Sequence, residues 1–342
     1  MLIRFAALLA MLATPAAAQQ AVPAFSLPES NQLSPEARDV LRRMVEARAP
    51  DLQGDLTRQR AFYGKFNDDR LAEMKRIFAT RETRTQLGGV VVDIVTPTRA
   101  PSGAAAKRVL INVHGGAFMW GSGSGALVEA IPIAATMGVK VVTVDYRLAP
   151  EHKYPAASED VTAVYRALLK QYRPENIGIY GCSAGGVITA QSVAWIGQQG
   201  LPRPGAIATL CGTGAPYSGD SVYLAGPLTG TPAMATGPLP DILPTRYMAG
   251  VPASDTAAYP LISASERAKF PPVLMLAGSR DFAASALTFA HRRLSADGVK
   301  SELYLFDGLP HAFFVWPEMP ESREAYAIIA RFFGRNLGTG KR

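Results

Sequence analysis

The sequence predicts an α/β fold, in which a mostly parallel central sheet is covered by helices on both faces. From residue 90 onward, short apolar runs of strand length alternate with segments of helix length. Hydrophobic residues make up 48% of the 342-residue chain and charged residues only 18%, so most of the chain can bury a core. Apolar strands separated by helices are typical of a parallel sheet, because a parallel pair needs a long crossover connection.

The expected strands and helices follow one another in order along the chain. Seven runs have the length and composition of strands, at residues 90–95, 109–113, 139–144, 177–180, 206–210, 273–276 and 303–306. Five segments have the length and composition of helices, at residues 127–137, 156–170, 184–196, 283–294 and 322–333. We therefore assign residues 87–339 to one α/β domain.

Two stretches depart from this alternation. Residues 19–86 are expected to form an N-terminal helical cap segment, because apolar residues recur at helical spacing from residue 35 to about residue 84. The polar backs of these helices predict that their apolar stripes pack on another surface. Residues 217–270 are rich in proline and glycine, which indicates an insertion over the sheet edge that belongs partly to the cap and pocket.

The first 18 residues have the three-part layout of a secretory signal peptide. A basic start at Arg4 precedes an apolar run over residues 5–14, and alanines at 16–18 suit a signal peptidase, so we expect cleavage after Ala18. The apolar run is shorter than the ~20 residues that span a bilayer, although an uncleaved anchor is the alternative. The mature protein is therefore expected to be exported, to a periplasm or outside the cell, with no stable membrane anchor.

The charge and the cysteine content argue against two classes of protein, nucleic-acid binders and disulfide-built scaffolds. The net charge is +7, but the basic residues are scattered pairs without a run or an RNA-binding motif, so no nucleic-acid partner is predicted. Two cysteines exclude a disulfide-built scaffold. Cys182 and Cys211 could pair in an oxidising compartment, but the sequence does not show that their side chains meet.

A nucleophile motif lies at one strand-to-helix turn. Residues 181–185 read Gly-Cys-Ser-Ala-Gly, between the strand at 177–180 and the helix at 184–196. Glycines let such a turn close tightly around a strained serine, and the following helix N-terminus favours developing negative charge. We therefore predict that Ser183 is a catalytic nucleophile, whereas a plain helix cap is the alternative.

A second glycine-rich loop follows the strand at 109–113. Residues 114–118 read His-Gly-Gly-Ala-Phe, and such a loop can bring backbone N–H groups close to a reacting oxygen. His114 is interpreted as a structural residue that orients the loop. The expected oxyanion donors are Gly115, Gly116, Ala117 and, just past the nucleophile, Ala184.

The base and the acid are sought at the carboxyl ends of later strands, where α/β sheets build their sites. His311 lies in a turn after the strand at 303–306, and Asp281 holds the equivalent position one strand earlier. His152 precedes the nucleophile, and His291 is expected on a solvated helix face. The chain order Ser183, Asp281, His311 is that of the α/β-hydrolase fold.

Three segments together resemble the hormone-sensitive-lipase-like carboxylesterases, the bacterial family IV group of the "alpha/beta hydrolase-3" type. They are residues 114–118, the run Asp-Tyr-Arg-Leu-Ala-Pro-Glu at 145–151 that leads to Tyr-Pro-Ala-Ala at 154–157, and Gly-Cys-Ser-Ala-Gly-Gly at 181–186. The resemblance covers about residues 86–337. It implies a helical cap over an acyl pocket, short- to medium-chain acyl esters as substrates, and no cofactor or metal. Many relatives also dimerise through the edge strand after the base, so a homodimer is a candidate assembly.

The sequence departs from the family at two positions. The family usually has aspartate before the nucleophile, where this chain has Cys182, and a second aspartate four residues after the acid, where it has Ser285. Neither departure removes a member of the expected triad.

The resulting hypothesis is a serine carboxylesterase that acts on a small-molecule ester through an acyl-enzyme intermediate. Phe118, Met119 and Trp120 are expected near the acyl pocket, although packing beneath the cap explains them equally well. The alternatives are an amidase or deacetylase that uses the same triad, and a non-catalytic ligand binder on a hydrolase fold. The presence of His311 argues against the binder.

Overall fold

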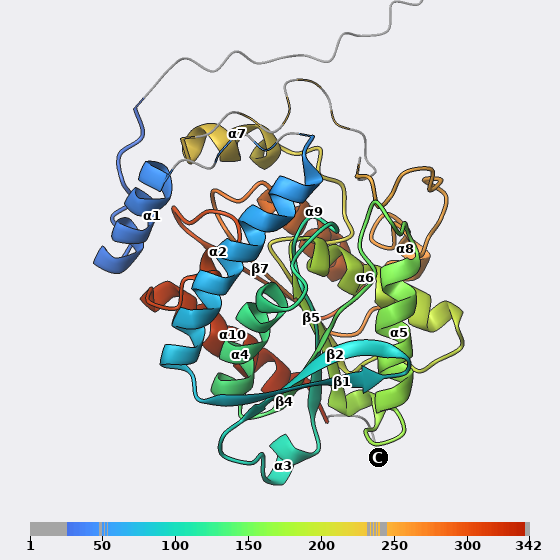
Figure 1. Ribbon diagram of the computed structural model, residues 1–342. Helices are drawn as coiled ribbons and strands as arrows, with labels where there is room; N and C mark the ends of the chain where they lie inside the picture. Colours follow the sequence, from blue (N-terminus) through green and yellow to red (C-terminus); the bar gives the residue numbers. More distant parts are fainter. Residues whose placement is uncertain are drawn as a thin grey trace, which may run out of the picture.

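The computed structural model describes residues 26–47, 50, 52, 54–230, 233, 235, 237, 239 and 245–338. An eight-stranded sheet in the order β1-β2-β4-β3-β5-β6-β7-β8 runs through this part of the chain (Figure 1). β1 pairs with β2 and β2 with β4 in antiparallel fashion, and the remaining neighbours are parallel. The strands are β1 (Thr80–Leu87), β2 (Val90–Pro97), β3 (Val109–Val113), β4 (Lys140–Val144), β5 (Ile177–Cys182), β6 (Ala206–Leu210), β7 (Val273–Gly278) and β8 (Ser301–Phe306).

Helices cover both faces of the sheet, which confirms the predicted α/β class. α5, α6 and α9 bury their apolar residues against one face, and α4 and α10 bury theirs against the other. Every residue of β3, β5, β6 and β7 is buried, as expected for parallel strands covered on both sides. The helices are α1 (Pro35–Ala47), α2 (Leu56–Ile77), α3 (Gly103–Ala106), α4 (Ser124–Met137), α5 (Ala156–Leu168), α6 (Ala184–Gln198), α7 (Asp220–Leu228), α8 (Ala264–Arg267), α9 (Ala284–Ala296) and α10 (Pro320–Asn336).

The expected helical pattern up to about residue 84 is wrong at its C-terminal end. α2 ends at Ile77, Phe78 is extended, and β1 begins at Thr80. β1 is an edge strand whose side chains are mostly exposed, so it lacks the apolar alternation that would reveal a strand. Its eight residues pair in register with all eight residues of β2.

The N-terminal helices pack on the body of the domain. α2 contacts α4, and Figure 1 shows the two helices side by side. α1 buries Ala37 and Val40 in the same core cluster as α10. The prediction that this segment needs another surface for its apolar stripes therefore agrees with the contacts of both helices.

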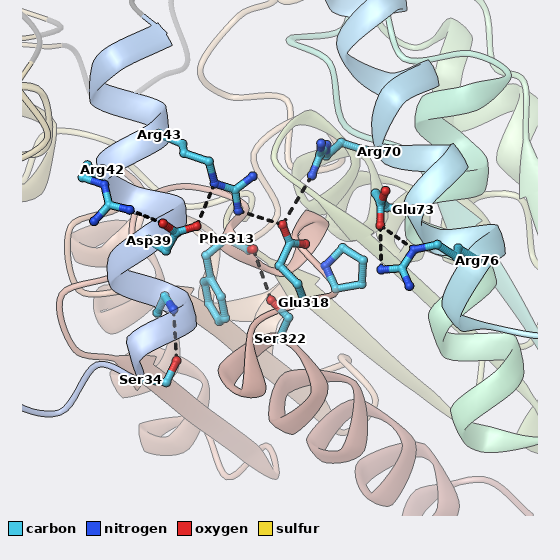
Figure 2. Close-up of polar contacts among 12 residues, drawn as sticks. Ser34, Asp39, Arg42, Arg43, Arg70, Glu73, Arg76, Phe313, Glu318 and Ser322 are labelled. Carbon is cyan, nitrogen blue, oxygen red and sulfur yellow. Dashed lines mark hydrogen bonds and ion pairs between the residues drawn. The ribbon is translucent and has the colours of Figure 1, made fainter.

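Glu318 joins the two N-terminal helices to the loop that follows β8. Figure 2 shows this carboxylate between Arg43 of α1, at 3.1 Å, and Arg70 of α2, at 3.8 Å. The guanidinium of Arg70 also lies over the ring of Trp316, 4.0 Å from its centroid. α1 and α2 are therefore both joined to the chain segment that follows His311.

Other parts of the expected domain plan lie partly or wholly outside the described residues. Residues 1–18, the predicted signal peptide, are not among them. In the segment 217–270 the structure describes α7 and α8 with their flanking turns, and α7 lies against α9. Within the described ranges, no helix is both long and apolar enough to cross a membrane.

Candidate active site

Ser183 occupies a strained turn between β5 and α6. Its φ and ψ are 57° and −124°, a conformation that residues with a side chain rarely adopt. The neighbouring glycines are required by close packing, because a Cβ at Gly185 would lie 1.8 Å from the carbonyl oxygen of Val113, and one at Gly181 would lie 2.2 Å from it. The turn therefore has the geometry expected of a nucleophile elbow.

The three predicted members of the triad lie within hydrogen-bond distance of one another. His311 Nε2 is 3.0 Å from Ser183 Oγ, and His311 Nδ1 is 2.9 Å from Asp281 Oδ1. Asp281 is fully buried after β7, and its Oδ1 also accepts the N–H of Ala283 at 2.8 Å. The Phe282 ring stacks on the imidazole, with centroids 4.4 Å apart. Ser183, His311 and Asp281 therefore form one continuous hydrogen-bonded chain.

The other histidines lie elsewhere. His114 is buried, stacks on Tyr146, and its Nδ1 is 2.7 Å from the carbonyl oxygen of Gly115. Burial lowers the pKa of His114 to about 4, so its imidazole is neutral at neutral pH, as suits a structural residue. His152 is exposed. His291 is only partly exposed, contrary to the expected solvated face, and its Nδ1 is 2.9 Å from Ser301 Oγ.

The loop at residues 114–118 lies directly against the nucleophile. A Cβ placed on Gly115 would be 3.3 Å from the Cβ of Ser183, and Gly116 and Ala117 both have positive φ. Among the described residues, none accepts a hydrogen bond from the backbone N–H of Gly116, Ala117 or Ala184. These three expected donors are therefore available for an oxygen at the nucleophile.

Gly115 differs from the other expected donors. Its N–H donates to Oε1 of Glu129 at 2.7 Å, so it is already committed within the protein. The expectation that Gly115 donates to an oxyanion therefore disagrees with the structure. The reason is a carboxylate on α4, which no local pattern around Gly115 reveals.

The three expected acyl-pocket residues have different surroundings. The Phe118 ring is buried and stacks on Tyr247, with centroids 4.8 Å apart. Trp120 stacks on Tyr63 of α2, with centroids 4.5 Å apart. The carbonyl oxygen of Met119 accepts a hydrogen bond from Arg60 Nε at 2.9 Å. All three residues therefore join the loop to neighbouring segments, and their role as pocket residues stays a prediction.

Cys182 and Cys211 are joined in a disulfide, which decides a question that the sequence left open. Their Cα atoms are 5.3 Å apart, and the bond links the end of β5 to the residue after β6. Within the described ranges, the one group of side chains that could converge on a metal ion is Cys182, Cys211 and His311. Because its two sulfur atoms are bonded to each other, this group offers no thiolate ligand.

Ser285, the second departure from the family, connects the inserted segment at residues 217–270 to the segment that contains Asp281. Ser221 N donates to Ser285 Oγ at 3.1 Å, and Ser285 N donates to Ser221 Oγ at 3.0 Å. Ser221 Oγ in turn donates to the carbonyl oxygen of Phe282 at 2.7 Å. The serine at 285 therefore holds α7 beside the residue that stacks on His311.

Glu129 is not among the predicted site residues, although it contacts the site directly. Besides the N–H of Gly115, its carboxylate accepts a hydrogen bond from Asn112 Nδ2 at 3.1 Å. The sequence does hold a signal, because Glu129 is the one charged residue in a mostly apolar helix.

The fold and the site define an α/β hydrolase with a serine nucleophile. The family model described as "alpha/beta hydrolase fold" matches residues 110–315 of the chain, and the chain belongs to this family. It is 31% identical to the "Carboxylesterase/phospholipase LipF" of Mycobacterium tuberculosis over 273 residues, which cover 75% of this chain and 72% of that protein.

Two solved structures are similar to this chain over most of its length. "Esterase E25" superimposes with a TM-score of 0.79 at 26% identity, over 93% of this chain and 99% of that one. An "esterase from the bacterial hormone-sensitive lipase (HSL) family" gives 0.75 at 25% identity, over 89% of this chain and 99% of that one. The resemblance inferred from the three sequence segments is thereby confirmed.

Proposed function

We propose that this protein is a carboxylic ester hydrolase that acts on short- to medium-chain acyl esters through Ser183, His311 and Asp281. The observation that carries the proposal is the hydrogen-bonded chain from Asp281 Oδ1 through both ring nitrogens of His311 to Ser183 Oγ, at 2.9 and 3.0 Å. Relatives named esterase and carboxylesterase support this activity. No resident cofactor is needed for such a reaction.

In the first step, Ser183 is acylated. Oγ attacks the ester carbonyl carbon while its proton passes to His311 Nε2, and Asp281 holds the imidazole in the required tautomer and stabilises its charged form. The negative oxygen of the tetrahedral intermediate is held by backbone N–H groups of Gly116, Ala117 and Ala184. The C–O bond then breaks, and His311 returns its proton to the departing alcohol.

In the second step, water releases the acid. His311 takes a proton from the water as its oxygen attacks the acyl carbon, and the same N–H groups hold the new oxyanion. The bond to Ser183 Oγ breaks and Oγ regains a proton from the imidazolium. The free carboxylic acid leaves, and the enzyme is restored.

The test replaces Ser183 with alanine and compares turnover of p-nitrophenyl acetate and butyrate. We expect activity to fall by roughly 10³-fold or more, because the variant loses the nucleophile. Ser192→Ala is the matched control, since Ser192 lies on the same helix α6, away from the turn. Undiminished hydrolysis by Ser183→Ala would contradict the assignment.

Two further measurements separate the alternatives. Comparing esters with the corresponding anilides decides between an esterase and an amidase or deacetylase, because both can use one triad. Stoichiometric labelling of Ser183 by a fluorophosphonate distinguishes an enzyme from a non-catalytic binder, because an inert binder leaves the serine unreactive.

We also propose that the protein is exported after cleavage behind Ala18. The basic, apolar and small-residue sequence of the first 18 residues supports this proposal. N-terminal sequencing of protein secreted or extracted from the periplasm should begin at Gln19. A mature protein that still begins at Met1 would favour an anchor instead.

A further inference from the structure

Glu129 holds the Gly115 peptide from behind the oxyanion loop, which we define as residues 114–118. Oε1 accepts the N–H of Gly115 at 2.7 Å, and Oε2 accepts Asn112 Nδ2 at 3.1 Å. Asn112 is itself fixed, because its Oδ1 accepts the hydroxyl of Thr143 at 2.7 Å. Both carboxylate oxygens are thus fixed, one by the loop and the other through strand β3.

Two carbonyl oxygens of the oxyanion loop also accept hydrogen bonds. The carbonyl oxygen of His114 accepts the hydroxyl of Tyr146 at 2.9 Å. The carbonyl oxygen of Gly116 accepts the N–H groups of Met119 and Trp120, at 2.8 and 3.0 Å. Rotation of the peptide between His114 and Gly115 would break the bond to Glu129 and turn the following peptides with it.

We propose that Glu129 is a positioning residue for the oxyanion loop, because it holds the Gly115 peptide so that the N–H groups of Gly116 and Ala117 face the reacting oxygen. The inference rests on the proposed function, and it assigns a role to a residue outside the triad. Glu129 touches no reacting atom and acts only through the loop. Hydrogen bonds to a charged acceptor are about twice as strong as neutral ones, which suits this role.

The pKa of the Glu129 carboxyl group lies close to neutral pH. Burial raises the pKa of its carboxyl group to about 7, against hydrogen bonds from Gly115, Asn112 and the backbone of Cys182 that lower it. His311 also lowers this pKa through its charge. Glu129 therefore gains or loses its proton close to neutral pH.

The other titratable groups packed around Glu129 keep one charge state there. Tyr180 of β5 donates to the Glu129 backbone, and Tyr146 follows β4; burial raises the pKa of both phenols well above 10. Tyr326 of α10, which shares a small cavity with Glu129, also has a pKa raised by burial. His114 stays neutral because its pKa is lowered to about 4. His311 also interacts with Glu129 through its charge.

The sign of the pH effect follows from the hydrogen bonds. As pH rises, Glu129 loses its proton and becomes a full acceptor for Gly115. This change favours turnover, so the acidic limb of the pH–rate profile should contain an ionisation that belongs to Glu129. A protein in which residue 129 cannot ionise should lack that ionisation.

The experiment measures kcat and KM for p-nitrophenyl butyrate from pH 5 to 9 in the wild type, Glu129→Gln, Glu129→Ala and the control Glu36→Gln. Glu36 is exposed on α1, far from the oxyanion loop in the sequence. For Glu129→Gln we expect kcat at high pH within about threefold of the wild type, because the amide oxygen can still accept from Gly115. Its acidic limb should lack the ionisation of residue 129. For Glu129→Ala we expect kcat to fall roughly 10- to 100-fold with little change in KM, because the lost alignment acts in the transition state.

Some outcomes would overturn the proposal. These are the same acidic limb of the pH–rate profile in the wild type and Glu129→Gln, or a kcat for folded Glu129→Ala within about twofold of the wild type. If Glu129→Ala does not fold, the pH profile of Glu129→Gln decides alone. Absence of ester turnover and of fluorophosphonate labelling in the wild type counts against the proposed function, whereas normal wild-type turnover with unaltered variants counts against Glu129 only.

Discussion

At the scale of single residues, the site depends on two fixed orientations, of the imidazole of His311 and of the backbone of the oxyanion loop. Asp281 Oδ1 accepts from both His311 Nδ1 and the N–H of Ala283, and the ring of Phe282 lies on the imidazole. The carboxylate of Asp281 thus fixes the ring's tautomer as well as its position.

Replacing Asp281 with asparagine tests this orientation. An amide carries no charge, so it stabilises the imidazolium less than the carboxylate does. If its NH₂ group takes the position of Oδ1, it donates to His311 Nδ1 and holds the wrong tautomer. We expect kcat for p-nitrophenyl butyrate to fall by roughly 10⁴-fold while the fold persists, as when the aspartate of such a triad is made an amide. Steady-state kinetics with circular dichroism on the same sample measure both, and a loss of less than about tenfold would argue that Asp281 does not orient the base.

At the scale of elements, Arg60 and Tyr63 join helix α2 to the residues that directly follow the oxyanion loop. Arg60 donates from Nη1 and Nη2 to the two carboxylate oxygens of Glu151, both at 2.8 Å, and from Nε to the carbonyl oxygen of Met119 at 2.9 Å. Tyr63, three residues on, stacks on Trp120. The N-terminal helix therefore takes part in shaping the site although it contributes no catalytic group.

Arg60→Ala should loosen this connection. We expect kcat/KM for butyrate esters to fall about tenfold, with the change mainly in KM, since charge-assisted hydrogen bonds contribute about 1.5–3 kcal/mol each at most. Arg58→Ala is the matched control, because Arg58 is exposed on the same helix. Equal kinetics of the two variants would show that α2 does not influence the site.

The elements also show which parts of the fold could be predicted. The four central strands β3, β5, β6 and β7 were predictable because burial on both faces demands continuous β-branched and apolar runs. β1 was not, because an exposed edge strand is held by its backbone pairing with β2 rather than by its own apolar side chains.

The active site also has parts that the sequence predicts and parts that it does not. Ser183, Asp281 and His311 were predictable because each lies in a local motif at the end of a strand, and the chain order then selects among four histidines. The bond between Gly115 and Glu129 was not, because it joins two segments whose separation depends on how α4 packs against β3. The Cys182–Cys211 pairing likewise needed the neighbouring ends of β5 and β6.

At the scale of the whole molecule, the disulfide restrains the unfolded chain. It closes a loop with a sequence separation of 29. For a loop of this size, chain entropy predicts a stabilisation of about 3–4 kcal/mol. Cys182→Ser/Cys211→Ser should therefore lower the free energy of unfolding by about this amount in denaturant titrations, and a thiol assay on the unfolded wild type should detect no free cysteine. Two reactive thiols would contradict the pairing.

The pH dependence of stability offers a second test at this scale. The pKa of Glu129 is raised in the folded protein to about 7 from 4.5, so its favourable contribution exists below pH 4.5 and is lost as pH rises through 7. Relative to Glu129→Gln, the wild type should therefore become more stable between pH 8 and pH 5, by about 3 kcal/mol at most. Parallel urea titrations at the two pH values measure this difference. An identical change in both proteins would mean that Glu129 is ionised to the same extent when folded and unfolded.

The most direct measurement of the central claim is peptide mapping of the wild type and of His311→Ala after reaction with a fluorophosphonate. The account predicts one adduct per wild-type chain, located on Ser183, and its loss in His311→Ala, because the serine needs the imidazole to take its proton. Ester hydrolysis by a wild-type protein whose Ser183 stays unlabelled, or an adduct on another residue, would contradict it.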